Sequence, residues 1–151
     1  MKKLVCLVAI GLMAVWIANV SGDEAGAKQD LEKLQGEWTM VMGEIEGQAM
    51  PEQMRAVMRR VAKDDETTIT MAGQLFMKAK FTVDPSKTPK AIDYNMTGGP
   101  TSGKTQLGIY EIDGERVKFC FGSPGKERPT SFKTEAGDGR TLSIWTRKKE
   151  P

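Results

Sequence analysis

The chain has 151 residues, with 22 Lys and Arg, 20 Asp and Glu, and no histidine. Nucleic acids and anionic membrane surfaces both require a basic face, so this near-neutral balance argues against either as the main partner. The lack of histidine excludes Ser-His-Asp and Cys-His catalytic sites and imidazole-based metal sites, and the sequence predicts no catalytic residue, metal ligand or cofactor.

Residues 1–22 are predicted to be a signal peptide. Lys2 and Lys3 precede an uncharged apolar run, Leu4 to Val20, and small residues follow it, as is typical of exported chains. Cleavage is expected after Ala18 or after Gly22. The alternative is a retained anchor, because residues 4 to 20 are marginally long enough to span a bilayer. We therefore expect a periplasmic or extracellular protein that contacts a membrane only if the signal is not cleaved.

Cleavage would leave a flexible leader, residues 23–33, and one domain, residues 34–151. The domain is large enough to bury a core. Its single cysteine, Cys120, excludes an intramolecular disulfide. Cys120 lies in the middle of a predicted strand, where a small buried thiol is expected.

The first predicted strand runs from Leu34 to Ile45. An amphipathic helix follows, from Glu52 to Ala62, begun by Pro51 at a favoured first-turn position. Its apolar positions have the i, i+3, i+4, i+7 spacing of a core-facing stripe: Met54, Val57, Met58 and Val61. Its outward positions are expected to be Arg55, Arg59 and Arg60.

The rest of the chain alternates with a period of two and predicts strands. The predicted strands are 67–71, 75–83, 91–97, 105–112, 115–121, 130–135 and 140–147. Counted from Gly36, the chain therefore has about eight strands and one short helix. This predicts a mainly β fold, an antiparallel up-and-down barrel, which we favour over a sandwich because closure removes exposed edges.

The central feature of this pattern is a hairpin, Thr105 to Phe121, around Asp113-Gly114. Asp-Gly favours a type I′ turn, which would place Tyr110 opposite Val117 and Glu111 opposite Arg116. One face of the hairpin is then apolar and expected to be buried: Gly108, Tyr110, Ile112, Val117, Phe119 and Phe121.

The stretch Gly98–Thr105 matches the phosphate-loop pattern G-x-x-x-x-G-K-[ST]. That loop needs a following helix whose N-terminus meets the phosphates. Here a strand is predicted after Lys104, and Pro100 removes one backbone donor. We therefore predict a loop between strands and no nucleotide site.

Gly36-x-Trp38 lies near the start of the first predicted strand, and Arg147 lies at the end of the last. These two strands pair in an up-and-down barrel, so the Arg147 guanidinium is expected to pack on Trp38 in a cation–π contact that closes the barrel.

Together with these residues, four segments carry a family resemblance. They are LQGEW (34–38), DPSKTPKAID (84–93), GKTQLGIYEIDGERVKFCF (103–121) and ERPTSF (127–132). The set resembles a family of small, often exported planctomycete domains of the lipocalin-like superfamily, which has no established function. The resemblance implies a lipocalin-like β-barrel and no catalytic residues.

Our leading functional expectation is a barrel that binds a small, at least partly apolar ligand. Tyr110, Phe119 and Phe121 are expected to line it, with Arg128 at a polar end of the ligand and Asp93 the first carboxylate to consider. The second expectation is a solid-cored module that contacts another envelope protein. The third is a hydrolase using carboxylates such as Asp93 and Glu111.

Overall fold

The computed structural model describes residues 22–149 and 151. Apart from Gly22, the predicted signal peptide and its cleavage positions lie outside the described residues. The described chain contains two helices and nine strands. In order, they are α1 (Gly22–Leu34), β1 (Gly36–Ile45), β2 (Gln48–Ala49), α2 (Glu52–Ala56), β3 (Met58–Lys63), β4 (Glu66–Met71), β5 (Gln74–Asp84), β6 (Lys90–Gly98), β7 (Thr105–Asp113), β8 (Arg116–Phe121) and β9 (Thr141–Arg147).

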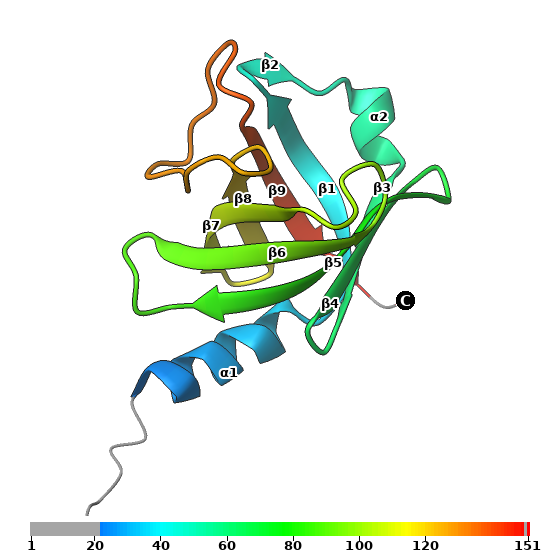
Figure 1. Cartoon of the computed structure of the whole chain (residues 1–151). Coiled ribbons are helices and arrows are strands. Elements are labelled where there is room, and N and C mark those ends of the chain that lie inside the picture. The colour runs from blue at the N-terminus through cyan, green and yellow to red at the C-terminus, as the bar shows by residue number, and fades with distance from the viewer. Residues whose placement is uncertain (1–21, 150) are drawn as a thin grey trace, which may run out of the picture.

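Eight of the strands form a closed antiparallel barrel. Strands β3 to β9 pair in sequence order, and β1 pairs with both β3 and β9 to close the ring (Figure 1). The two-residue strand β2 is an extra strand that folds back on the end of β1. The prediction of a mainly β, up-and-down barrel is therefore confirmed.

The barrel interior holds the main core because inward and outward residues alternate along each strand. On β3, for example, every second residue is buried, and β6 buries Ile92, Tyr94 and Met96. The largest fully buried side chains of this core include Trp38, Trp145, Phe81 and Phe119. The strand predicted over 91–97 lies within β6 and has the predicted buried face.

The predicted turn of the β7–β8 hairpin is wrong by one residue. Gly114 and Glu115 are the two turn residues, and Asp113 pairs with Arg116. Gly114 has a φ of +56°, whereas Glu115 has no positive φ. A positive φ at the first turn residue only is the type II′ pattern, which also favours glycine.

This turn shifts the hairpin register by two residues. Tyr110 lies opposite Phe119, and Glu111 lies opposite Lys118, with which it forms an ion pair of 3.1 Å. The predicted pairs of Tyr110 with Val117 and of Glu111 with Arg116 are therefore absent. A shift of two keeps every side chain on its own face, so the predicted buried face is still the inward one.

The helix predicted from Glu52 to Ala62 is wrong beyond its first turn. Only α2, five residues long, is helical, and the chain then enters β3. Strand β3 points Met58, Arg60 and Ala62 inward, whereas Val61 is exposed. Pairing with β1 on one side and β4 on the other stabilises an extended chain over the marginal helix that a short segment forms alone. The expected outward orientation of Arg60 is also wrong.

Helix α1 replaces the flexible leader expected over residues 23–33. It closes one end of the barrel, where its last residue, Leu34, is fully buried and accepts a hydrogen bond from Trp38 Nε1 at 3.1 Å (Figure 1). Asp30 of α1 is also buried and accepts hydrogen bonds from Tyr110 Oη at 2.8 Å and Lys90 Nζ at 2.7 Å. Because α1 is mostly polar, its sequence does not predict these two contacts with the barrel.

The strand predicted over 130–135 is wrong. Residues 122–140 form one long connection between β8 and β9 that lies over the outer wall. Phe132 from this connection packs on a small outer cluster of Ile109, Cys120 and Leu142. Burial raises the pKa of the Cys120 thiol, so the thiol stays protonated and shielded.

The Cys120 thiol is expected to react slowly in the folded protein. A disulfide reagent at pH 8 should modify it at least about 100-fold more slowly than in the unfolded chain, because reaction requires local opening of the 122–140 connection. The measurement uses a Cys6→Ser chain, in which Cys120 is the only cysteine. Equal rates with and without denaturant would contradict the burial of this thiol.

Candidate functional site

A cavity of about 330 Å³ occupies the half of the barrel interior farther from α1. It opens between the end of β1 and the β6–β7 turn, where Ile45, Pro100 and Thr101 line it. The opposite end is closed by α1, as Figure 1 shows. The interior is therefore a pocket that is closed at the α1 end, its floor, and open at the other end, its mouth.

The cavity wall consists mainly of methionine and aromatic side chains. The methionines are Met40, Met50, Met58, Met77 and Met96, and the aromatic residues are Phe76, Tyr94, Phe119, Phe121 and Trp145. Methionine is flexible and polarizable, so its side chains adapt to apolar ligands of different shape. The wall is suited to an apolar molecule.

Three rings pack against one another along one side of this wall. The centroids of Tyr94 and Phe121 are 4.3 Å apart, and those of Phe119 and Phe121 are 5.9 Å apart. Gly108 lies opposite Phe121, and a Cβ at position 108 would lie only 2.9 Å from the Cys120 carbonyl oxygen and would overlap the Phe121 ring. Glycine at 108 therefore allows Phe121 to lie against the strand and leaves space in the cavity.

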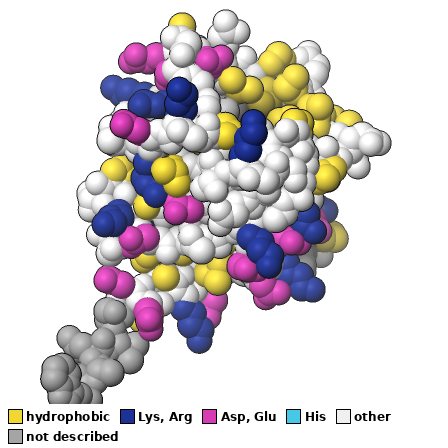
Figure 2. Space-filling view, viewed as in Figure 1, with side chains coloured by type: hydrophobic (Ala, Val, Ile, Leu, Met, Phe, Trp, Pro, Cys, Tyr) yellow, Lys and Arg dark blue, Asp and Glu magenta, His cyan; other side chains and the backbone are white. Residues whose placement is uncertain are grey.

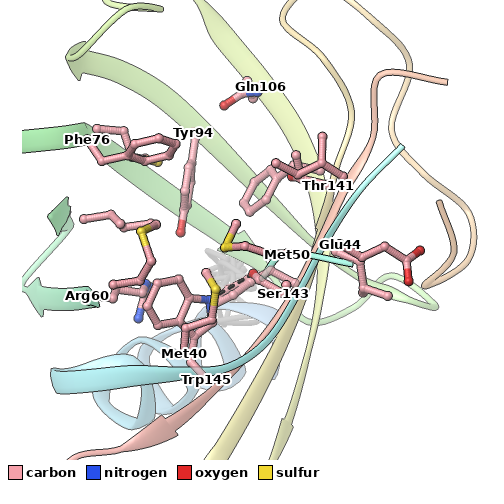
Figure 3. Close-up of a pocket in the computed structure, with 18 of the residues that line it drawn as sticks. Met40, Glu44, Met50, Arg60, Phe76, Tyr94, Gln106, Thr141, Ser143 and Trp145 are labelled. Carbon is pink, nitrogen blue, oxygen red and sulfur yellow. Dashed lines mark hydrogen bonds between the residues drawn. The ribbon is translucent and has the colours of Figure 1, made fainter. Parts of the chain in front are cut away.

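Few polar groups line the cavity. Trp145 donates its indole N–H to Ser143 Oγ at 2.9 Å, as Figure 3 shows. Glu44 lies near the mouth, where one carboxylate oxygen accepts a hydrogen bond from the Thr134 hydroxyl. Thr101, Gln106 and Thr141 also line it. The basic side chain of the lining is Arg60, which lies beside Met40 and Trp145 in Figure 3 and has no exposed surface.

The rim of the mouth and the adjoining surface expose large apolar side chains. Ile45, Leu75 and Phe76 are 44%, 53% and 43% exposed. Met54 and Val57, in and just after α2, are also exposed. In Figure 2, hydrophobic side chains gather over and beside α2. An apolar molecule that enters the cavity would cross this apolar rim.

Of the five residues that the sequence suggested for ligand binding, two line the cavity. These are Phe119 and Phe121. Tyr110 also points inward, but it lies at the closed end and bonds to Asp30 of α1. Burial, followed by this hydrogen bond, raises the pKa of Tyr110, so Tyr110 stays a neutral donor. Tyr110 therefore helps to hold α1 against the end of the barrel.

Arg128 and Asp93 lie outside the cavity. They form an ion pair of 2.7 Å with each other, and Arg128 also donates to the carbonyl oxygens of Ile92 and Gly108. Arg128 therefore ties the 122–140 connection to β6 and β7. The expectation that it meets a ligand in the barrel has no geometric support.

The three residues suggested for barrel closure lie together at the α1 end. The Arg147 guanidinium carbon is 4.3 Å from the Trp38 ring centroid, so the predicted cation–π contact is present. Arg147 also donates to the carbonyl oxygens of Lys33 and Gln35. Gly36 has a φ of +101°, and a Cβ there would be 3.0 Å from an Arg147 nitrogen. Glycine at 36 leaves room for this arginine.

The two carboxylates considered for hydrolysis do not share a site. Asp93 pairs with Arg128 and Glu111 pairs with Lys118, and neither lines the cavity. In the described chain, no three His, Cys, Asp or Glu side chains come together as a metal site would require. Asp93 and Glu111 therefore do not form the paired carboxylates that the hydrolase expectation requires.

The phosphate-loop look-alike, Gly98–Thr105, spans the turn between β6 and β7. A strand follows it, as predicted, because β7 begins at Thr105. Two of its backbone amides, at Gly103 and Lys104, donate to carbonyl oxygens of Met96 and Thr101. These amides are therefore occupied within the turn, which contributes to the mouth of the cavity.

Comparisons of the chain with protein-family models, with curated proteins and with solved structures found no match. Among the described residues, neither helix has the length and apolar character needed to cross a bilayer.

Proposed function

We propose that this domain binds one small, largely apolar molecule inside the barrel. The observation that carries the proposal is the cavity of about 330 Å³, which is within the range of small-molecule sites. Eight-stranded barrels either fill their interior with side chains or hold one small ligand. The open cavity favours the second of these.

The closed floor and the apolar mouth support the same proposal. Helix α1 and the contact between Trp38 and Arg147 block one end of the barrel, so a molecule enters and leaves through the other. The up-and-down barrel also supports the lipocalin-like assignment suggested by the sequence motifs. We place the domain outside the cytoplasm on the strength of the basic and apolar pattern of residues 1–22.

The test is titration of the purified protein with 1-octanol, measured by isothermal titration calorimetry. Filling the cavity with Met77→Trp is expected to weaken binding at least about tenfold. Because Met77 lines the cavity and is buried, the larger ring takes the space of the ligand. Thermal unfolding with and without octanol gives a second readout, since a ligand of the native state raises the transition temperature.

Val61→Trp is the matched control. It adds the same side chain at an exposed position on the outer face of β3, so octanol binding should be unchanged. Equal weakening by both substitutions would indicate a general loss of folding. No octanol binding by the wild-type barrel would contradict the proposal and favour a module that contacts another protein.

A further inference from the structure

Arg60 is a charged side chain at the inner end of the cavity. It lies on the inward face of β3, opposite Trp38 of β1 and Ile69 of β4. It has no exposed surface and lines the cavity (Figure 3). Guanidinium groups remain charged at all ordinary pH values, so the barrel interior contains a buried positive charge.

That charge has no ionic or hydrogen-bonding partner in the described chain. None of the three guanidinium nitrogens of Arg60 has a hydrogen-bond acceptor, and no carboxylate lies within ion-pair distance of it. Its one electrostatic contact is with the Phe119 ring, whose centroid is 4.9 Å from the guanidinium carbon. A cation–π contact offsets only part of the cost of removing an arginine from water.

A second unpartnered polar group lies near Arg60. Thr67 of β4 is fully buried, and its hydroxyl has no hydrogen-bonding partner in the described chain. Thr67 is two residues from Ile69, the residue opposite Arg60, so it is a diagonal cross-strand neighbour within reach of a long side chain. Buried polar groups are nearly always paired in native proteins, so two unpaired donors together call for an explanation.

We propose that the cavity binds an amphiphile with a carboxylate at one end, and that Arg60 binds this carboxylate. The inference rests on the proposed function and names the class of ligand. An arginine fork matches a carboxylate with two parallel hydrogen bonds. One guanidinium balances one negative charge, whereas a phosphate dianion would leave a buried charge uncompensated.

The rest of the cavity fits the tail of such a molecule. From Arg60 toward the mouth, the wall is mostly apolar and rich in methionine and aromatic side chains, with Gln106 and Thr141 among its polar residues. At about 30 Å³ for each water-sized group, a cavity of 330 Å³ holds roughly eleven non-hydrogen atoms. Octanoate has this size. Glu44 is the acidic residue of the lining, and its bond to Thr134 holds it at the mouth, away from the floor.

The experiment compares octanoate with 1-octanol, which has the same chain without the charge. The wild-type protein should bind octanoate at least about tenfold more tightly at pH 7. Arg60→Met should weaken octanoate binding about thirtyfold, which corresponds to about 2 kcal/mol, and leave octanol binding within about threefold. Isothermal titration measures both affinities.

Arg59→Met is the matched control, because it removes the same charge from the exposed outer face of β3 and should leave both affinities unchanged. Without ligand, Arg60→Met should be at least as thermally stable as the wild type, since an apolar side chain replaces an unpaired buried charge. A fall in stability with unchanged octanoate affinity would assign Arg60 a structural role and overturn the inference.

The wild-type protein alone also decides the matter if Arg60→Met fails to fold. Equal affinity for octanoate and octanol would overturn the assignment of Arg60 while leaving the proposed binding function intact. Binding of neither compound would contradict the binding function itself.

Discussion

Replacing Trp38 by alanine is expected to lower the free energy of unfolding by about 4 kcal/mol. Trp38 has no exposed surface and is among the largest buried side chains of the protein. Its truncation leaves a cavity where β1 starts, and large-to-small changes of this kind cost both the transfer free energy of the lost atoms and the void that they leave. Urea unfolding followed by circular dichroism measures the change.

The position of Trp38 adds to this cost. Its indole N–H bonds to the Leu34 carbonyl oxygen, and its ring lies against Arg147 from the last strand. The side chain therefore joins α1, β1 and β9, the elements that meet where the barrel closes. A loss of less than about 1 kcal/mol would contradict this account.

Trp38→Phe separates the ring from its hydrogen bond. It retains most of the buried apolar surface but removes the N–H donor, so we expect a loss of about 1 to 2 kcal/mol. The Leu34 carbonyl oxygen would then lack its side-chain partner. If Trp38→Phe and Trp38→Ala lowered the free energy of unfolding equally, the loss would come from the hydrogen bond to Leu34, and the packing of the ring would contribute little.

The β-strands with one buried face were predictable because the alternation of their side chains reports burial directly. Tyr94 and Met96 show this on β6. The hairpin register was less certain, since Gly114 suits the second turn position of a type I′ turn and the first of a type II′ turn. Local sequence does not separate these two turns. The inward face was still correct because the two registers differ by an even number of residues.

Strand β3 was missed because two periodicities overlap in its sequence. Met54, Val57, Met58 and Val61 have helical spacing, whereas Met58, Arg60 and Ala62 alternate as in a strand. An arginine at an inward position conceals the second pattern, since charged residues are rarely buried. The signal that was available is the polar Asp64-Asp65 pair between residues 58–63 and the β-branched strand β4, where Asp64 has a φ of +55°.

The candidate site was predictable in part for the same reason. Phe119 and Phe121 belong to an alternating strand, so their inward direction follows from the sequence. The inward position of Arg60 follows only if residues 58–63 form a strand, because a helix over the same residues turns Arg60 outward. The separation of Tyr110 from the cavity depends on α1, whose Asp30 covers that end of the barrel.

Replacing Asp30 by alanine is expected to lower the free energy of unfolding by about 2 to 3 kcal/mol. Asp30 is only 3% exposed, and its carboxylate accepts hydrogen bonds from Tyr110 and Lys90. Lys90 is 41% exposed and can be solvated by water once Asp30 is removed, so the loss of its ion pair contributes little to the fall in the free energy of unfolding. Most of the loss comes from the buried Tyr110 hydroxyl, which is left without an acceptor.

A double-mutant cycle tests this assignment. Adding Tyr110→Phe to Asp30→Ala removes the unpaired hydroxyl, so the double variant should be less destabilised than the sum of the single changes by at least about 1 kcal/mol. Asp23→Ala is the control, because Asp23 is an exposed acid in the first turn of the same helix; it should cost less than about 0.5 kcal/mol. Equal effects at positions 23 and 30 would mean that α1 is held by its apolar contacts, chiefly Leu34, and that the buried carboxylate contributes little to closing the barrel.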